Sequence, residues 1–482
     1  MNRLNKADAK RLVSYIKRNG VKASVYKVIE RLDRDNQEKS YSKDVFDLID
    51  DKEREELFRT KKFTHSYRFS IIVPAYETGK RRFLEMVESC FEQVYDNFEL
   101  CIADASITDE INNTVIEYKE QYPDRASKIN YLRLSENKGI SDNTNEALKL
   151  ATGEYIALLD HDDVITKDAL FEAMCVLEDG ITTECGIRTN RIKLIYSDED
   201  KCNDELNEFF DYHIKPDFDI DLLRTNNYIC HLLFVRRELA LSVGGFSKDY
   251  DGAQDHDFIF RCVEKLNRDE IAHIPRVLYH WRSHVSSTAT NPDSKLYAYE
   301  AGKRAITDHL KRLGIDCEVV DTEHLGFYRV KYNVSSEDLT KVSIMTSEEL
   351  KDMGYDAVMA SDFEYIMILN NNVRPKSYEF IEEMLGYLKR EDTGCVGGLV
   401  IGKNGKIESA GYTIDASLNL IPCFAGLNRN YSGYLHRAKL QREVDGVCTD
   451  CMMVKKRALT EELALKKEYL VIYSPYSIFK RV

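Results

Sequence analysis

Alternating strands and helices after residue 69 constrain the fold more than any other feature of the sequence. Buried-strand patterns such as FSIIVPA (69–75) and FELCIAD (98–104) alternate with segments of helical spacing such as RRFLEMVESCFEQV (81–94). Strands joined by helices pair in parallel, because each helix returns the chain to the same end of the sheet. The sequence therefore predicts an α/β fold that is Rossmann-like, with a mostly parallel sheet and helices on both faces.

Acidic residues follow these strands at the positions where such sheets bind ligands. Asp104 ends one strand, and YIALLDHDDV (155–164) runs from a strand pattern into Asp160, Asp162 and Asp163. Crowded carboxylates repel one another, so a fold that carries them supplies a cation or hydrogen-bond partners. Because ligands bind beyond the carboxyl ends of the strands, these acids predict a functional site. A polar loop that caps the next helix is the structural alternative.

Two kinds of chemistry fit the carboxylates of LLDHDDVI (158–165). In a phosphatase of the haloacid dehalogenase type, Asp160 would be the nucleophile and Asp162 the acid. In a DxD site, the acids would hold Mg²⁺ or Mn²⁺ against the diphosphate of a nucleotide sugar. Hard divalent cations prefer oxygen ligands and keep substrate phosphates in their shell, so this motif alone leaves both chemistries open.

Composition excludes some classes of function. The net charge of -14 and the pI near 5.4 argue against a surface for nucleic acid. The 12 cysteines are scattered, which favours free thiols in a reducing compartment. The N-terminus lacks the apolar core of a signal peptide, and no apolar run reaches the ~18 residues that span a bilayer. We expect a cytoplasmic protein, and the basic first helix leaves peripheral binding at the inner face of the cell membrane open.

A series of motifs makes the region 69–290 resemble glycosyltransferase family 2, the inverting nucleotide-sugar enzymes of GT-A fold. In order they read FSIIVPAYE, LCIADAS, ENKGISDNTNEALKLATGEYIALLDHDD, LIYSDEDK, KPDFDIDLLRTNNYICHLLFVRRELALSVGGF, GAQDHDFIFRC and IPRVLYHWRSHVSSTA. In the phosphatases the nucleophile strand opens the domain, whereas here two strand ends precede it. The motifs most resemble bacterial members that build cell-surface polysaccharides, including rhamnose-containing ones.

The resemblance implies a donor site at the strand ends. The residues implied to border the nucleotide sugar are Pro74, Ala75, Tyr76, Glu77, Asp104, Gly139, Asp160 and His161. Asp104 would accept a hydrogen bond from the base, which gives a buried acid a partner. The family usually has two acids at this strand end, and here Ala103 takes the first position. Gly139 serves equally well as an ordinary turn residue.

The resemblance also implies a metal site and a catalytic base. Mn²⁺ or Mg²⁺ would be held by Asp160, Asp162, Asp163 and His280, with Asp163 either bound directly or placed behind the ligands. In GAQDHDFIFR (252–261), Asp255 would be the general base, with Gln254 in place of the commoner Glu. The alternative is that Asp255 and Asp257 only cap a helix. Asn227, His231 and Trp281 would shape the acceptor side.

An internal repeat divides the chain. The predicted regions are an N-terminal helical region (1–66), the catalytic domain (67–290), a helical linker (291–330) and a degenerate, truncated second glycosyltransferase-like domain (331–482). In the repeat, YIMILNNNV echoes YIALLDHDDV, which aligns Asn370 with Asp160 and Asn372 with Asp162, and CMMVKKRAL echoes HLLFVRREL. We expect this second part to lack the first nucleotide strand and a second QDHDF, and not to catalyse transfer.

The sequence thus predicts a metal-dependent, inverting hexosyl- or rhamnosyltransferase of polysaccharide synthesis. Its partners would be a nucleotide-diphosphate sugar, a glycan or lipid-linked acceptor and a polysaccharide-assembly partner, with no nucleic acid. A phosphatase, or a carbohydrate-binding or scaffold protein without activity, remains the alternative.

Overall fold

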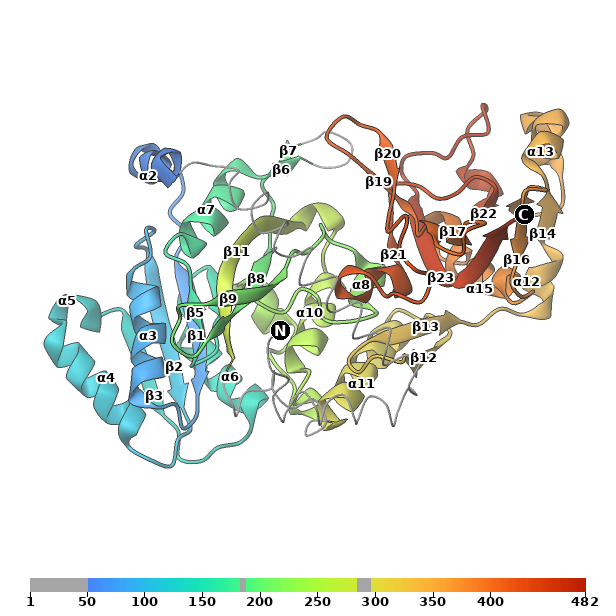
Figure 1. Ribbon diagram of the computed structural model, residues 1–482. Helices are drawn as coiled ribbons and strands as arrows, with labels where there is room; N and C mark the ends of the chain where they lie inside the picture. The colour runs from blue at the N-terminus through green and yellow to red at the C-terminus, as the bar shows by residue number, and fades with distance from the viewer. Residues whose placement is uncertain (1–50, 183–187, 284–295) are drawn as a thin grey trace. The chain divides into compact units, whose positions relative to one another are not determined.

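A computed structural model describes residues 51–182, 188–283 and 296–482 (Figure 1). The helices predicted within residues 1–50 lie outside these ranges. The described chain forms two compact units. The first unit comprises the described parts of residues 51–218 and Asn227–Leu313, and the second comprises Asp219–Asn226 and Gly314–Val482. Over the described ranges, no helix combines the length and the apolar character needed to cross a membrane. The domain boundaries predicted at residues 67, 290 and 330 stay predictions.

The first unit is built on a nine-stranded sheet with the order β3-β2-β1-β4-β10-β8-β11-β5, with β9 paired to β8. The strands are β1 (Phe69–Ala75), β2 (Phe98–Asp104), β3 (Ile129–Arg133), β4 (Tyr155–Leu158), β5 (Val164–Ile165), β8 (Leu194–Asn203), β9 (Phe209–His213), β10 (Leu233–Arg236) and β11 (Ile271–Ser283). Strands β3, β2, β1 and β4 are parallel, β10 and β5 run in reverse, and β8 is parallel to β11. The predicted mostly parallel sheet is confirmed.

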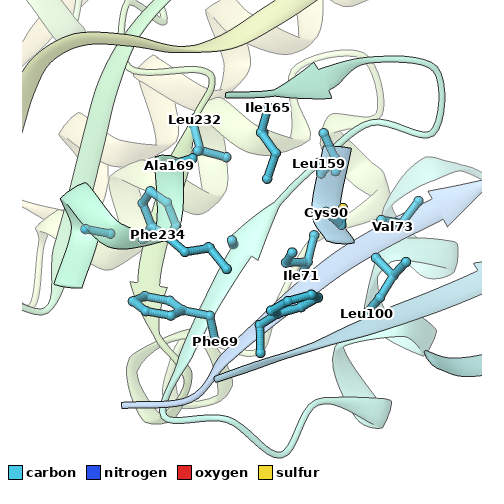
Figure 2. Close-up of a cluster of buried hydrophobic side chains, with 14 of the residues drawn as sticks. Phe69, Ile71, Val73, Cys90, Leu100, Leu159, Ile165, Ala169, Leu232 and Phe234 are labelled. Atoms are coloured by element: carbon cyan, nitrogen blue, oxygen red, sulfur yellow. The ribbon is translucent and has the colours of Figure 1, made fainter. Parts of the chain in front are cut away.

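Helices cover both faces of this sheet, as predicted. Phe69, Ile71 and Val73 of β1 point into a core that also contains side chains of α3, α4 and α7 (Figure 2). Ile72 points to the opposite face, where it lines a cavity with residues of α6. The helices are α2 (Asp51–Thr60), α3 (Lys80–Phe91), α4 (Glu110–Gln121), α5 (Pro123–Ala126), α6 (Ile140–Leu150), α7 (Ala169–Asp179), α9 (Arg237–Ser242), α10 (Gln254–Val263) and α11 (Leu296–Arg312). All residues of β1 and β2 are buried, which explains their continuous apolar pattern.

The second unit contains a sheet with the order β14-β15-β22-β17-β23-β16. This path repeats the path β1-β4-β10-β8-β11-β5 of the first unit, with the same parallel and antiparallel sense at every step. The strands are β14 (Val342–Met345), β15 (Tyr365–Leu369), β16 (Val373–Pro375), β17 (Thr393–Ile401), β22 (Cys451–Lys455) and β23 (Leu470–Arg481). The predicted GT-A-like partial repeat is therefore confirmed.

One expectation about the repeat is wrong. The sequence suggests that the first nucleotide strand is missing, but β14 occupies the sheet position of β1. Its short sequence VSIM has no Pro turn to mark the end of the strand, so the sequence does not predict it. In the described part of the second unit, the strands without a counterpart are β2 and β3, because the chain between β14 and β15 forms only α13 (Ser347–Met353) and α14 (Tyr355–Ala360). Between β22 and β23 only the short helix η6 (Lys456–Ala458) is found, so α10 has no counterpart either.

The other elements of the second unit complete its core. They are α8 (Ile220–Leu223), β12 (Cys317–Asp321), β13 (Tyr328–Tyr332), α12 (Ser336–Thr340), α15 (Phe380–Leu388), β18 (Ile407–Ser409), β19 (Tyr412–Ile414), β20 (Leu420–Pro422), η5 (Tyr434–Lys439) and β21 (Arg442–Glu443). The segment that contains α8 is far from the rest of this unit in sequence. Asp221 of α8 is fully buried, with its carboxylate 2.5 Å from the Arg390 guanidinium.

Candidate active site

The acidic loop after β4 has two partly exposed carboxylates and one buried carboxylate. The side chains of Asp160 and Asp162 are 47% and 21% exposed, whereas Asp163 is buried. Asp163 accepts hydrogen bonds from the Tyr279 hydroxyl and, at 2.7 Å, from the backbone N–H of Arg282. Burial, followed by the charges of Asp160 and Asp162, raises the pKa of Asp163. Asp163 therefore braces the loop, while Asp160 and Asp162 are the acids that a ligand can reach.

Arg282 fixes this loop to β11. Its guanidinium is buried, donates to the backbone carbonyl of Asp162 at 2.6 Å and pairs with Glu85 at 2.7 Å. The motif LYHWRSH contains Arg282, but no role for it follows from the sequence, because its partner Glu85 comes from α3. The guanidinium thus holds the backbone of the acidic loop in place without using the carboxylate of Asp162.

A small cavity of about 60 Å³ brings together residues from separate motifs. Its lining includes Pro74 at the end of β1, Asp160 after β4, His231 before β10, and Asp255 at the start of α10. Gln254 also lines this cavity. These residues come from the predicted donor, metal, acceptor and base sets. The structure therefore joins members of all four sets at one place.

Asp255 is held in the first turn of α10 from outside its own helix. Its Oδ2 accepts a hydrogen bond from Asn227 Nδ2 at 2.8 Å and lies 3.5 Å from Cys230 Sγ. Asp257, in contrast, is fully buried and bonds to Arg261 one turn further along α10, at 2.6 and 2.8 Å. The two acids of QDHD therefore differ. Asp255 lines the cavity, and Asp257 stabilises the helix.

His231 lies between the acidic loop and β11. Its Nε2 is 3.8 Å from Asp160 Oδ2, and its ring stacks on Tyr279 with 4.7 Å between centroids and 12° between planes. Tyr279 also accepts the backbone N–H of Asp160 at 3.4 Å. The predicted acceptor residues Asn227 and His231 thus contact the predicted base and metal acid respectively.

The segment VPAYE forms the end of β1 and the following turn. Tyr76 is 40% exposed, and Ala75 pairs with Asp104 in the ladder between β1 and β2. The carboxylate of Glu77 accepts the backbone N–H groups of Thr108 at 3.1 Å and Ile107 at 2.5 Å. These bonds lower the pKa of Glu77. Glu77 therefore ties the two strand-end loops together.

Asp104 is buried with both carboxylate oxygens in use. Oδ1 accepts the N–H of Ser106 at 2.9 Å, and Oδ2 accepts the Tyr131 hydroxyl at 2.7 Å and the Arg133 guanidinium at 2.5 Å. The sequence predicts Asp104 but not Arg133, which ends β3. Base recognition by Asp104 would have to share these partners, so Arg133 belongs to the same candidate subsite.

Gly139 has a specific structural reason for being glycine. It is the N-cap residue of α6 with φ of +101°, and a Cβ there would lie 2.6 Å from Asp251 Oδ2. Asp251 Oδ1 accepts the Ser141 hydroxyl at 2.5 Å, so the loop before α10 is attached to the start of α6. Gly139 therefore allows close packing against Asp251, in addition to the turn that the sequence suggests.

The remaining predicted residues lie around the acidic loop and β11. His161 Nδ1 is 2.5 Å from Thr78 Oγ1, which connects the loop to the turn after β1. His280 Nδ1 is 2.6 Å from Oδ1 of the buried Asp200, its neighbour in the ladder between β8 and β11. The Lys201 ammonium lies 5.6 Å from the ring centre of Trp281.

The second unit contains a counterpart of this site with different chemistry. The pairing of β22 with β15 places Asp450 where the pairing of β10 with β4 places His231. Asn370 Nδ2 donates to Asp450 Oδ1 at 2.8 Å, Asn372 Nδ2 donates to Oδ2 at 3.0 Å, and Arg481 lies 2.5 Å from Oδ2. A guanidinium therefore supplies the positive charge beside the strand end.

A separate acidic cluster in the second unit is formed by Asp219, Asp221 and Glu443, with ligand atoms within 4.8 Å of one another. It is not the predicted metal site. Arg390 lies 2.5 Å from Asp221, and Arg224 lies 3.8 Å from it, so arginine charges already balance these acids. We assign no metal to this cluster.

Part of the first unit is similar to known proteins. The family model described as Glycosyl transferase family 2 matches residues 70–238. Uncharacterized protein y4gI of Sinorhizobium fredii is 29% identical over 84% of this chain and 49% of its own length. O-antigen biosynthesis protein RfbC of Myxococcus xanthus is 30% identical over 65% of this chain and 24% of its own length. The chain thus spans half or less of these relatives.

Two solved structures show more distant similarity. Staphylococcus aureus TarS 1-349 in complex with UDP is 19% identical, covers 50% of this chain and 65% of TarS 1-349, and has a TM-score of 0.37. Mannosyltransferase PcManGT from Pyrobaculum calidifontis in complex with GDP-Man and Mn²⁺ is 20% identical, covers 54% of this chain and 69% of its own, and has a TM-score of 0.36.

The family match covers the strand-end residues and the acidic loop of the site, whereas Asp255 and the residues of β11 lie beyond it. It extends from β1 through the acidic loop to the start of α9, which follows β10. The first unit also has the predicted mostly parallel sheet, with Asp104 at the end of β2 and Asp160 just after β4. Residues 70–238 of this chain are therefore a glycosyltransferase family 2 domain with a GT-A fold.

Proposed function

We propose that this protein is a metal-dependent, inverting glycosyltransferase that transfers a hexose or rhamnose from a nucleotide-diphosphate sugar to a glycan or lipid-linked acceptor, in the synthesis of a cell-surface polysaccharide. The observation that carries this proposal is the cavity lined by Asp160, His231 and Asp255 at the strand ends of a family 2 domain. The similarity to an O-antigen biosynthesis protein supports the polysaccharide context.

The acidic loop is the proposed site of Mn²⁺ or Mg²⁺. Asp160 and Asp162 offer partly exposed carboxylate oxygens, which hard divalent cations prefer. Asp163 would support them from behind, because its oxygens accept hydrogen bonds from Tyr279 and Arg282. His280 is the proposed imidazole ligand, since a carboxylate on Nδ1, here Asp200, is the usual support of a ligating histidine. The cation would neutralise charge on the leaving diphosphate.

Asp255 is the proposed general base. The acceptor hydroxyl oxygen would bond to the anomeric carbon as the bond from that carbon to the diphosphate oxygen breaks, with inversion. The hydroxyl proton would pass to Asp255. Its described hydrogen bonds, from Asn227 and Cys230, all reach Oδ2, so Oδ1 is the oxygen proposed to take the proton.

A screen of nucleotide sugars tests the function directly. The full chain would be incubated with UDP-, GDP-, and dTDP-sugars in turn, with and without Mn²⁺, and released nucleoside diphosphate would be measured. We expect one donor class to be turned over only with metal. A phosphatase would instead form a covalent aspartyl-phosphate at Asp160, and a scaffold protein would release no nucleotide from any donor.

We also propose that the second unit does not catalyse transfer. The variant Asn370→Ala with Asn372→Ala should leave donor turnover within about threefold of wild type, because substitutions outside the chemistry act mainly on stability. Its melting temperature should fall, since Asn370 Nδ2 bonds to Ser347 at 3.0 Å and to Asp450 at 2.8 Å. Initial rates and thermal melts measure the two effects.

The matched control changes the first site, with Asp160→Asn and Asp162→Asn. This variant should lose turnover although it changes only the two corresponding positions of the first unit. The proposal fails if the control still transfers sugar at a rate that disappears only when Asn370 and Asn372 are changed as well.

A further inference from the structure

Glu199 and Lys215 form a buried ion pair next to the cavity that the proposed chemistry does not use. Lys215 Nζ lies 3.3 Å from Glu199 Oε2, and the lysine side chain is completely buried. Isolated charges are costly to bury, and a buried pair is often no more stabilising than an apolar pair of similar volume. Stability alone therefore gives little reason for this ion pair, and its contacts indicate another role.

The side chains of Lys215 and Glu199 both bind backbone atoms at or near His231. Lys215 Nζ donates to the carbonyl oxygen of His231 and, at 2.7 Å, to that of Ile229. Glu199 Oε2 accepts the backbone N–H of His231 at 3.2 Å, and Oε1 lies 3.1 Å from His213 Nδ1. Although burial raises it, the charges of Lys215 and His213 bring the pKa of Glu199 to about 2. The carboxylate therefore stays charged at neutral pH.

The segment held in this way contacts a cavity-lining acid at each of its ends. At one end, Asn227 Nδ2 donates to Asp255 at 2.8 Å, and Asn227 Oδ1 accepts the N–H of Cys230 at 3.3 Å. At the other end, His231 Nε2 lies 3.8 Å from Asp160. Residues 227–231 thus connect the proposed base to the proposed metal acid.

We propose that Lys215 and Glu199 are positioning residues which set the spacing between Asp255 and Asp160 through the segment 227–231. This inference rests on the proposed function for its effect on rate. Both groups act on backbone atoms and touch neither Asp255 nor Asp160 in the described contacts. They fix the base in register with the acidic loop, and donor binding itself does not depend on them.

The test replaces the ion pair by neutral side chains of similar size, Lys215→Met with Glu199→Gln. We expect kcat to fall about 10- to 100-fold, the range found when supporting partners of a site are removed. The donor KM and the Mn²⁺ affinity, measured by calorimetry, should stay within about threefold. Equal losses in kcat and donor affinity would overturn the inference, because they would indicate general damage to the site.

A matched control uses another Lys–Glu pair of the same unit, Lys193→Met with Glu270→Gln. Lys193 Nζ lies 2.6 Å from Glu270, and no described contact joins either side chain to residues 227–231. This variant should lower the melting temperature without changing kcat. A comparable fall of kcat in the control would remove the special role of Lys215 and Glu199.

Amide hydrogen exchange gives a readout that does not need turnover. In the Lys215 and Glu199 variant, a peptide covering 227–231 should exchange at least about tenfold faster than in wild type, since the His231 N–H loses its charged acceptor. The control variant should show no change in that peptide. Unchanged exchange in the test variant overturns the positioning role, even if the wild-type protein turns over no donor. If the variant fails to fold, Glu199→Gln alone gives the same comparison.

Discussion

Asp162→Asn is expected to reduce sugar transfer by more than about 100-fold, because it removes a charged ligand while losses in the supporting shell of metal sites alone cost about 10- to 100-fold. The substitution should leave the fold intact. Arg282 binds the backbone carbonyl of Asp162 and not its carboxylate, so the loop keeps its anchor. Initial rates over a Mn²⁺ titration, together with calorimetric Mn²⁺ binding, measure the effect.

Asp179→Asn is a suitable control for this metal prediction. Asp179 lies at the end of α7, pairs with Lys61 at 2.6 Å and has a side chain that is 44% exposed. The same change of charge at that position should leave the rate unaltered. Full activity of the wild-type protein in excess chelator would contradict the metal proposal.

Asp255→Asn is expected to lower turnover by about 10² to 10⁴, the usual contribution of general-base assistance. Donor binding should be largely retained, since a residue that acts on the acceptor proton contributes to the transition state and not to donor affinity. Asparagine is close in shape, and its carbonyl oxygen can still accept the hydrogen bond from Asn227. Steady-state kinetics with the donor and acceptor varied separately would show the loss in kcat.

The neighbouring acid provides a contrast within the same motif. Asp257→Asn should reduce the melting temperature, because Asp257 is buried against Arg261. Asp255→Asn should melt close to wild type. A parallel loss of donor affinity and turnover in Asp255→Asn would make Asp255 a donor-site or structural residue instead of the base.

The parts of the fold that the sequence predicts are those with strong local patterns. The apolar runs of β1 and β2 predict the sheet, and the acids that follow the strands predict the edge at which the candidate site lies. The distinction between Asp162 and Asp163 was not accessible in this way. It depends on Tyr279 and Arg282 of β11, which donate hydrogen bonds to the buried Asp163 and not to the adjacent Asp162 carboxylate.

The features that the sequence does not predict depend on strand register and on contacts between residues far apart in the chain. The sequence echo CMMVKKRAL aligns Cys451 with His231, but the strand ladder shifts this alignment by one residue to Asp450. Strand β14 cannot be predicted because four residues without a turn motif carry little signal. Lys215 looks like an ordinary charged residue before a proline, since its partners Glu199 and the 229–231 backbone are adjacent only in space.

The short helix α8 has a consequence for synthesis and for truncation. It belongs to the second unit, yet the ribosome completes it before Asn227–Leu313 and long before the strands it packs with. Until then Asp221, which is buried in the finished protein, lacks its later partner Arg390. A chain cut after residue 313 would keep this exposed segment and lose Arg390. No single cut can separate the two units cleanly, so inactivity of such a fragment would report misfolding rather than a catalytic role of the missing part.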